Sequence, residues 1–286
     1  MIKMFIPRIA ALLLGVCLWG TGAHAQEILH TEASKFSPVV VYEARGERCI
    51  AFGSVQALGR QTCYLLEDPK RMVFNYTRMM MASLFVQPNP ARILIVGLGG
   101  GTLPTALAEL LPNAQIDTVE IDPAVVSVAT RYFGFVTSPR QQVHEADGRA
   151  YVEQAGREGR KYDLIMLDAF DYTYIPAHLM TREFLHQAKA LLAPQGVLAA
   201  NTFSTSQLYD RESATYADVF GEYFNLRSNN RVILAINGVL PDDGQIKRQA
   251  AAWAPKLAAY GIDVQRELDL FSRDVSWPPA TPILQD

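Results

Sequence analysis

The chain has 286 residues, of which 49% are hydrophobic and 19% are charged, a composition typical of globular proteins. This length supports one large hydrophobic core or two smaller ones, and the composition excludes a disordered or fibrous chain. Lys and Arg number 26 against 29 Asp and Glu, so the formal charge is -3. Because there is no basic excess to neutralise phosphates, we expect no nucleic-acid partner.

The first 25 residues have the pattern of a cleaved secretory signal peptide. Lys3 and Arg8 precede an apolar run at 9–20, and the Ala-His-Ala sequence at 23–25 places small residues at both positions that a signal peptidase reads. The apolar run is too short for a bilayer, which needs about 20 residues, so we favour cleavage over an uncleaved anchor and expect no stable membrane span. Cleavage leaves a chain of formal charge -5 in the periplasm or outside the cell.

Residues 26–70 predict a small antiparallel β unit that follows a polar lead-in. Three short segments alternate between apolar and polar residues and predict strands at 38–43, 48–52 and 61–66. Cys49 and Cys63 lie in the second and third of these strands, so a cross-strand disulfide is sterically allowed in an oxidising compartment. The sequence equally allows two buried thiols that never meet.

Residues 71–90 predict a connecting helix. The pattern favours helix over 71–86, and Pro88 and Pro90 prevent its continuation. Three consecutive methionines at 79–81 favour core packing over a ligand site.

Residues 91–240 alternate between apolar strands and amphipathic helices, which predicts a parallel sheet covered on both faces. Strands are expected at 92–96, 115–120, 142–145, 162–167 and 196–201, and helices at 102–111, 123–132, 148–155, 181–192 and 213–223. Segments 225–228 and 231–236 flank an Asn-Asn pair and predict an antiparallel hairpin. The expected fold is therefore α/β, a Rossmann-like, methyltransferase-type sheet ending in an antiparallel hairpin. Residues 241–286 predict a further helix and a Pro-rich tail.

A glycine turn follows the first of these parallel strands. The sequence Gly97-Leu98-Gly99-Gly100-Gly101-Thr102 stands between strand and helix, where glycines permit positive φ and a close approach of a ligand to the backbone. The N–H groups at the start of a helix favour an anionic or polar ligand. A glycine turn that serves only packing is the alternative, so this motif needs support from elsewhere in the chain.

Carboxylates at the ends of the next strands supply that support. Glu120 ends the second parallel strand, where it can accept both hydroxyl groups of a ribose, and Asp147 follows the third, within reach of an adenine amino group. Asp168 ends the fourth strand, and Asp171 follows three residues later. A nicotinamide enzyme would share the first features, but its fingerprint needs a small residue at Thr102 and has no use for the last pair. Helix capping or a loop hydrogen bond is the plain alternative for that pair.

In combination these motifs resemble the spermidine synthase (polyamine aminopropyltransferase) family. The resemblance rests on Ser37-Pro38, Tyr76, the glycine turn, Val119-Glu120-Ile121-Asp122, Asp147-Gly148, Asp168-Ala169-Phe170-Asp171 and 191–196. It implies an N-terminal β unit packed on a Rossmann-like domain, commonly in a homodimer. It also implies transfer of an aminopropyl group from decarboxylated S-adenosylmethionine to a polyamine.

The resemblance also implies roles for individual residues. Gly97, Gly99, Gly100 and Gly101 would line the donor site, with Glu120 on the ribose and Asp147 on the adenine. Asp168 would accept the proton of the attacking amine, because a free alkylamine has a pKa near 10 and must lose a proton to attack. Asp171, Tyr76 and Tyr172 would hold the polyamine. No metal is expected, since the histidines show no spacing typical of metal ligands.

Three departures from the family pattern alter these expectations. The family has an Asp in the glycine turn that pairs with the donor's ammonium group, and this chain has Gly100 there. Its Tyr-His-Glu triplet is Tyr76-Thr77-Arg78 here, and Tyr172 replaces a Pro. Losing one charged contact removes roughly 1.5 to 3 kcal/mol of binding. Two alternatives therefore stay open: a non-catalytic protein that binds a nucleoside or a polyamine, and a methyltransferase that uses intact S-adenosylmethionine.

Overall fold

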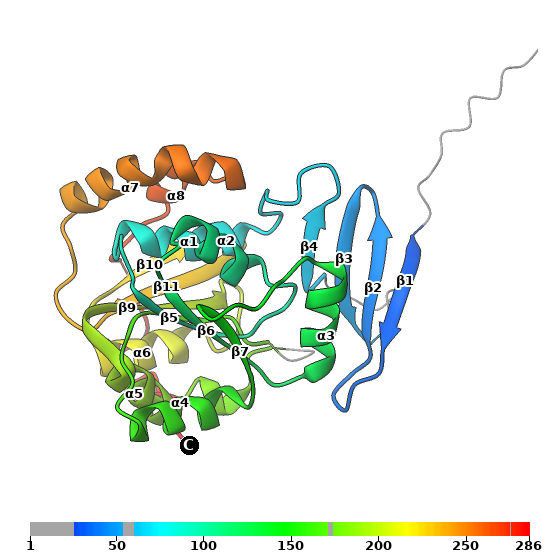
Figure 1. The fold of residues 1–286 in the computed structure, drawn as a ribbon. Coiled ribbons are helices and arrows are strands. Elements are labelled where there is room, and N and C mark those ends of the chain that lie inside the picture. The colour runs from blue at the N-terminus through cyan, green and yellow to red at the C-terminus, as the bar shows by residue number, and fades with distance from the viewer. Residues whose placement is uncertain (1–25, 54–59, 171–173, 275) are drawn as a thin grey trace, which may run out of the picture.

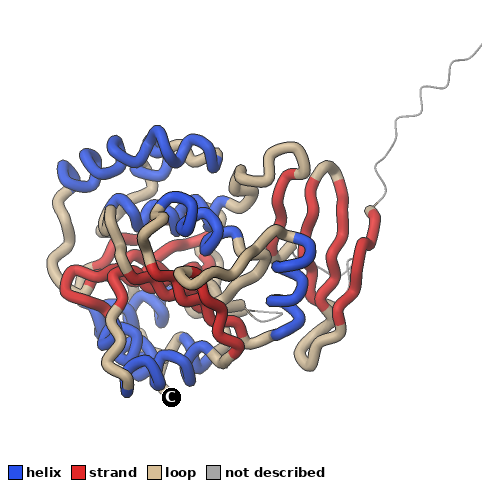
Figure 2. The backbone as a smooth tube through the Cα atoms, viewed as in Figure 1, coloured by secondary structure: helices blue, strands red, loops and turns tan. Residues whose placement is uncertain are grey.

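The computed structural model describes residues 26–53, 60–170, 174–274 and 276–286, so the predicted signal peptide at 1–25 lies outside the described residues. Two β-sheets organise the chain: a four-stranded antiparallel sheet and, after it, a seven-stranded, mostly parallel sheet. Figure 1 shows the small sheet beside the larger sheet and its helices, and Figure 2 shows the same arrangement by secondary structure. The predicted Rossmann-like α/β fold with an N-terminal antiparallel β unit is confirmed.

The N-terminal sheet contains one strand more than the sequence predicts. Its order is β1 (Glu27–Glu32), β2 (Val39–Ala44), β3 (Glu47–Phe52) and β4 (Thr62–Leu65), and all neighbours are antiparallel. The polar lead-in thus contains the edge strand β1. An edge strand pairs through its backbone and leaves one side to solvent, so its polar side chains carry little of the apolar alternation that reveals inner strands.

The larger sheet has the strand order β10-β11-β9-β8-β5-β6-β7. Its parallel strands are β5 (Arg92–Val96), β6 (Gln115–Glu120), β7 (Gln141–Glu145), β8 (Tyr162–Leu167) and β9 (Leu192–Phe203). The predicted terminal hairpin is formed by β10 (Tyr223–Arg227) and β11 (Asn230–Ile236), which pair antiparallel. The strand order reverses between β5 and β8, and ligands of open parallel sheets bind at such a switch point.

Helices cover both faces of the larger sheet. One face carries α1 (Asn75–Met81), η1 (Ala82–Phe85), α2 (Thr102–Leu110), α7 (Asp243–Leu257), η3 (Ala258–Tyr260) and α8 (Val264–Leu268). The other carries α4 (Gly148–Arg157), η2 (Ala177–Leu179), α5 (Arg182–Leu191) and α6 (Tyr209–Phe220). Within the described ranges, every helix is too short or too polar to cross a membrane.

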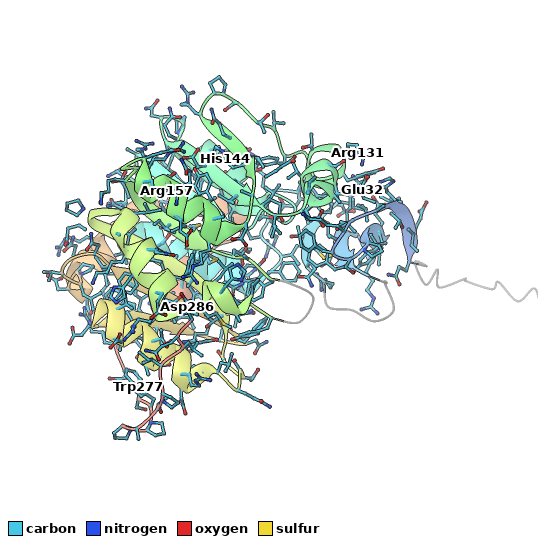
Figure 3. The ribbon with its side chains drawn as sticks, turned by 90° about the horizontal axis from the view of Figure 1, so that it is seen from below. Glu32, Arg131, His144, Arg157, Trp277 and Asp286 are labelled. Atoms are coloured by element: carbon cyan, nitrogen blue, oxygen red, sulfur yellow. A yellow bond between two sulfur atoms is a disulfide. The ribbon has the colours of Figure 1, made fainter. Side chains whose placement is uncertain are left out.

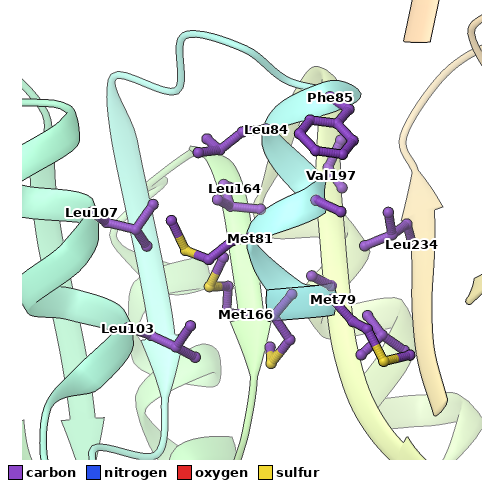
Figure 4. Packing of buried hydrophobic residues seen from close by; sticks show 14 of the residues in the cluster. Met79, Met81, Leu84, Phe85, Leu103, Leu107, Leu164, Met166, Val197 and Leu234 are labelled. Carbon is purple, nitrogen blue, oxygen red and sulfur yellow. The ribbon is translucent and has the colours of Figure 1, made fainter. Parts of the chain in front are cut away.

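The predicted core role of the methionines at 79–81 is confirmed. All three side chains are buried, and Met79 and Met81 pack against residues of the sheet and of α2 such as Met166 and Leu107 (Figure 4). Flexible thioether side chains fill the irregular gap between a short helix and a twisted sheet.

The predicted helix at 71–86 is shorter and begins later than expected. Residues 71–74 are not helical: Met72 forms an isolated β-bridge with Tyr64, and its N–H donates to the Tyr260 carbonyl over 2.9 Å. This long-range pairing, which periodicity cannot reveal, delays the helix to Asn75. The helix predicted at 213–223 instead spans Tyr209–Phe220: it begins earlier than predicted, and it ends earlier because the next residue, Gly221, has a φ of 77°.

Helix α3 (Pro123–Tyr132) joins the two sheets. Its apolar side packs against β2 and β3 through residues such as Val125 and Val128. Arg131 of α3 forms an ion pair with Glu32 of β1 (Figure 3), and the Ser34 hydroxyl donates to the Asp122 carboxylate over 2.6 Å. These contacts place the N-terminal sheet against the carboxyl end of β6.

A disulfide links the inner strand β3 to β4. Cys49 and Cys63 are paired in register and their sulfur atoms are bonded, so the structure has the bonded form of the two that the sequence allows. Within the described residues, the set Glu47, Cys49 and Cys63 is the one group close enough to hold a metal, and the bond uses both thiols.

Replacing Cys49 and Cys63 together by Ala should lower the free energy of unfolding by about 3 kcal/mol, because the bond closes a loop of roughly 15 residues in the unfolded chain. Urea denaturation of both proteins, with and without reductant, measures the difference. Reductant should weaken the wild type and leave the double variant unchanged. Equal stability of the two proteins in the absence of reductant would contradict the bond.

Candidate active site

A pocket of about 850 Å³ lies at the carboxyl ends of β5, β6 and β8, with β3 and β4 of the N-terminal sheet forming part of its wall. Its volume suits a nucleoside-sized ligand together with a second small molecule. The structure brings together most of the residues that the sequence singles out, and the following of them line the pocket: Tyr76, Gly97, Gly99, Glu120, Asp147 and Asp168.

The glycine turn depends on positive φ angles. Gly97, Gly99 and Gly101 have φ values of 103°, 54° and 80°, and Gly101 is the N-cap of α2. A Cβ at Gly97 would lie 2.7 Å from the carbonyl carbon of Asp168. Glycine at this position is therefore required for the close approach of the Asp168 backbone, as well as for its φ angle.

Glu120 bridges the glycine turn and the next strand. One carboxylate oxygen accepts the Leu98 N–H and the other accepts the Asp122 N–H, each over 3.0 Å. Burial raises the pKa of Glu120, although these backbone hydrogen bonds act in the opposite direction. Each oxygen keeps a further lone pair, so the carboxylate can still accept hydrogen bonds from a ligand.

Asp147 combines the predicted position with a capping role. It is the N-cap of α4, where its Oδ1 accepts the Ala150 N–H over 3.0 Å, and its Oδ2 lies 2.8 Å from Nε2 of His178. Partial burial would raise the pKa of Asp147, but the hydrogen bonds from Ala150 and His178 outweigh it and lower the pKa. Asp147 is thus a fixed carboxylate at the edge of the pocket.

Asp168 lies just beyond β8 beside the glycine turn. Its Oδ1 accepts the Asn201 side-chain N–H over 2.9 Å, and Tyr76 of α1 also donates a hydrogen bond to it. Burial raises the pKa of Asp168 to about 7, although both hydrogen bonds act in the opposite direction. Burial and the nearby Asp168 raise the pKa of Tyr76, so this phenol stays a neutral donor. A carboxyl group with a pKa near neutrality, aimed into a pocket, is suited to proton transfer.

Some of the predicted site residues do not line the pocket. Gly100 and Gly101 are buried behind its wall, against Thr62 and Phe135. Asp171 and Tyr172 lie outside the described residues.

Among the pocket residues that the sequence pattern does not single out are Thr62, His178 and Asn201. Asn201 carried a weak signal, since it is a polar residue inside the apolar end of β9. Thr62 and His178 carried no signal in the sequence. Thr62 binds Gly100 and His178 binds Asp147, and in both pairs the two residues are far apart in the chain.

Comparisons with known proteins agree with this geometry. The family model described as "Spermine/spermidine synthase domain" matches residues 73–240. A polyamine aminopropyltransferase from Vibrio vulnificus (strain CMCP6) is 47% identical over 265 residues, which cover 91% of this chain and 88% of the relative. The chain belongs to the spermine/spermidine synthase family.

Two further similarities are more limited. One extends to the fold but has low sequence identity, and the other covers only part of the chain. The crystal structure of a probable spermidine synthase from Corynebacterium glutamicum ATCC 13032 has a TM-score of 0.69 at 18% identity, covering 90% of this chain and 96% of that one. The human eEF1A lysine and N-terminal methyltransferase is 36% identical over 150 residues, which cover 47% of this chain and 22% of the relative. The similarity to the methyltransferase therefore covers about half as much of this chain as the similarity to the aminopropyltransferase does.

Asp168→Asn should stabilise the protein increasingly as the pH rises. Folding raises the pKa of this carboxyl from 3.8 to about 7, so the native state binds more protons than the unfolded state between these values, and stability falls as the pH increases through them. The neutral amide removes this loss, which is at most about 1.4 kcal/mol per pH unit. Urea denaturation between about pH 5 and about pH 8 measures it. The exposed Asp218→Asn serves as the control, and parallel pH curves for wild type and Asp168→Asn would contradict the pKa shift.

Proposed function

We propose that this protein is an aminopropyltransferase that moves an aminopropyl group from decarboxylated S-adenosylmethionine to a polyamine. The observation that carries the proposal is the arrangement at Asp168: a carboxyl group with a pKa of about 7 faces the pocket beside the glycine turn, held by Tyr76 and Asn201. The 47% identity to a polyamine aminopropyltransferase along 91% of the chain supports the same reaction. An acidic chain also suits a cationic substrate.

The reaction requires the acceptor amine in its neutral form, because only an unprotonated nitrogen has a lone pair that can attack. The nitrogen lone pair attacks the carbon beside the donor's sulfonium, the C–S electron pair moves to sulfur, and methylthioadenosine leaves. The attacking nitrogen gives up a proton, which Asp168 accepts. A carboxylate of ordinary pKa near 4 is a weak base toward an amine of pKa near 10, and the raised pKa of Asp168 narrows that gap.

The other pocket residues hold the two substrates in line. In this proposal Glu120 accepts the ribose hydroxyls with its remaining lone pairs, and Asp147 accepts the adenine amino group at the pocket edge. Tyr76 holds the polyamine together with Asp168, and Asp171 and Tyr172 would act at its far end. Fixing both reactants in one orientation supplies much of the rate enhancement of such a bimolecular displacement.

The alternative functions have weaker support. A methyltransferase shares the donor features, but the similarity to the human methyltransferase covers 47% of this chain. A non-catalytic protein that binds a nucleoside or a polyamine does not require a proton acceptor, whereas burial raises the pKa of Asp168 to about 7, a value that suits proton transfer.

Asp168→Asn should lower the turnover number by roughly 100-fold or more, since the amide cannot accept the proton. Methylthioadenosine released from decarboxylated S-adenosylmethionine and putrescine measures turnover, and calorimetry measures donor binding. Donor affinity should change little, and Asp218→Asn on the outer face of α6 should keep full activity. Wild-type turnover in Asp168→Asn would refute the assignment of the base.

We also propose that the protein is exported and loses residues 1–25. The charged start, short apolar run and Ala-His-Ala sequence support export, as does the Cys49–Cys63 disulfide, since such bonds persist in oxidising compartments. Assembly as a homodimer, which the family resemblance implies, stays a prediction that sedimentation equilibrium would test.

Expression of the full chain in a Gram-negative bacterium should yield a periplasmic protein whose N-terminal residue is Gln26. Fractionation by osmotic shock followed by intact-mass measurement checks both points, and the mass should also lack the two hydrogens of free thiols. Replacing Ala25 by Arg is the control, because a large charged residue at this position blocks signal cleavage. A cytoplasmic protein that retains Met1 would contradict export.

A further inference from the structure

Neighbouring side chains fill the space beside Gly100, the position in the glycine turn at which the family has an Asp. A Cβ at Gly100 would lie 2.5 Å from Cγ2 of Thr62 and 2.9 Å from Cδ1 of Phe133. Both distances are far below the 3.5 to 4.0 Å at which carbon atoms pack. The loss of the acid is therefore accompanied by a wall that leaves no room for a side chain at position 100.

Thr62 is fixed in that wall by its strand. Its Oγ1 accepts the Gly100 N–H over 3.1 Å, and it lies opposite Ile50 in the β3–β4 pairing. The next residue, Cys63, is bonded to Cys49 of β3. Thr62 as a whole is 8% exposed, and it lines the pocket. A hydroxyl group has one donor and two acceptor positions, so Thr62 keeps a donor for a ligand while it binds Gly100.

We propose that Thr62 determines donor selectivity by filling, with an uncharged side chain, the place where the family has a carboxylate. This inference rests on the proposed function. A carboxylate would attract the ammonium group of decarboxylated S-adenosylmethionine and repel the carboxylate of intact S-adenosylmethionine, whereas an uncharged threonine does neither strongly. The site therefore accepts S-adenosyl sulfonium donors whose three-carbon chain ends with or without a carboxylate.

The intact donor would react by the same displacement. The amine nitrogen forms its new bond to the carbon beside sulfur, the C–S electron pair moves to sulfur, and the proton passes to Asp168. Methylthioadenosine again leaves, and the amine receives a 3-amino-3-carboxypropyl group. No oxidant, reductant or further reactant is needed.

Calorimetric titration of four proteins with each donor tests the inference: wild type, Thr62→Ser, Gly100→Asp and the double variant. The wild type should bind both donors with dissociation constants within about tenfold of each other, a difference below about 1.4 kcal/mol. Thr62→Ser keeps the hydroxyl and removes the methyl, so it should preserve this ratio. Gly100→Asp alone should weaken both donors, because the new side chain collides with Thr62 and Phe133.

The double variant should prefer the decarboxylated donor by at least about tenfold more than the wild type does, since removing the methyl relieves the shorter of the two contacts and leaves the Phe133 ring to shift for the acid. Incubation of the wild type with putrescine and intact S-adenosylmethionine should give a product with the mass of putrescine that carries a 3-amino-3-carboxypropyl group. A wild type that prefers the decarboxylated donor by more than about 100-fold overturns the inference, and this measurement is independent of how the variants fold.

The two proposals fail in different ways. Donors that bind with similar affinity but release no methylthioadenosine in the presence of a polyamine would refute the proposed function and leave the selectivity intact. Efficient turnover of the decarboxylated donor with strong exclusion of the intact one would refute the selectivity alone. Absence of binding by either donor would overturn both.

Discussion

The pocket depends on how closely the chain after β8 approaches the chain after β5. At Gly97 the backbone passes so near the Asp168 carbonyl that a Cβ would overlap it. This contact brings the end of the fourth parallel strand against the glycine turn, which also begins α2 at Gly101. A larger residue at position 97 would push the two segments apart, and the pocket would lose the adjacency of the glycine turn and the Asp168 carboxyl.

That adjacency has an energetic cost, which falls on Asp168. Its neighbours withdraw the carboxyl from bulk water, so the ionised form is disfavoured, and Asn201 and Tyr76 offset only part of this penalty. An enzyme that must remove a proton from an amine benefits from such a base. The same environment that weakens the fold as the pH rises from 3.8 to about 7 thus makes the carboxyl useful, a conflict typical of active sites.

The parallel sheet and its glycine turn could be predicted because apolar runs, glycines and strand-end carboxylates are local signals. Strand β1 could not be predicted, because an edge strand is held by backbone pairing and its polar side chains show little of the apolar alternation that reveals inner strands. Asn201 and Thr62 belong to the site only through contacts between distant segments. The departures from the family pattern at Gly100 and Arg78 were visible in the sequence, but only the structure shows what surrounds each position. Gly100 is buried against Thr62 and Phe133, whereas the Arg78 guanidinium donates to the Met72 carbonyl and to Asn75, so that departure serves the local backbone.

The disulfide has a consequence for the entropy of ligand binding. Cys63 adjoins Thr62 in β4, so the covalent bond to β3 restricts the backbone that forms one wall of the pocket. The conformational freedom of this wall is lost once, when the thiols are oxidised, and does not have to be lost again each time a donor binds. Formation of the disulfide thereby preorganises the pocket, and the affinity of the disulfide-bonded protein for a ligand there includes a contribution made before the ligand binds.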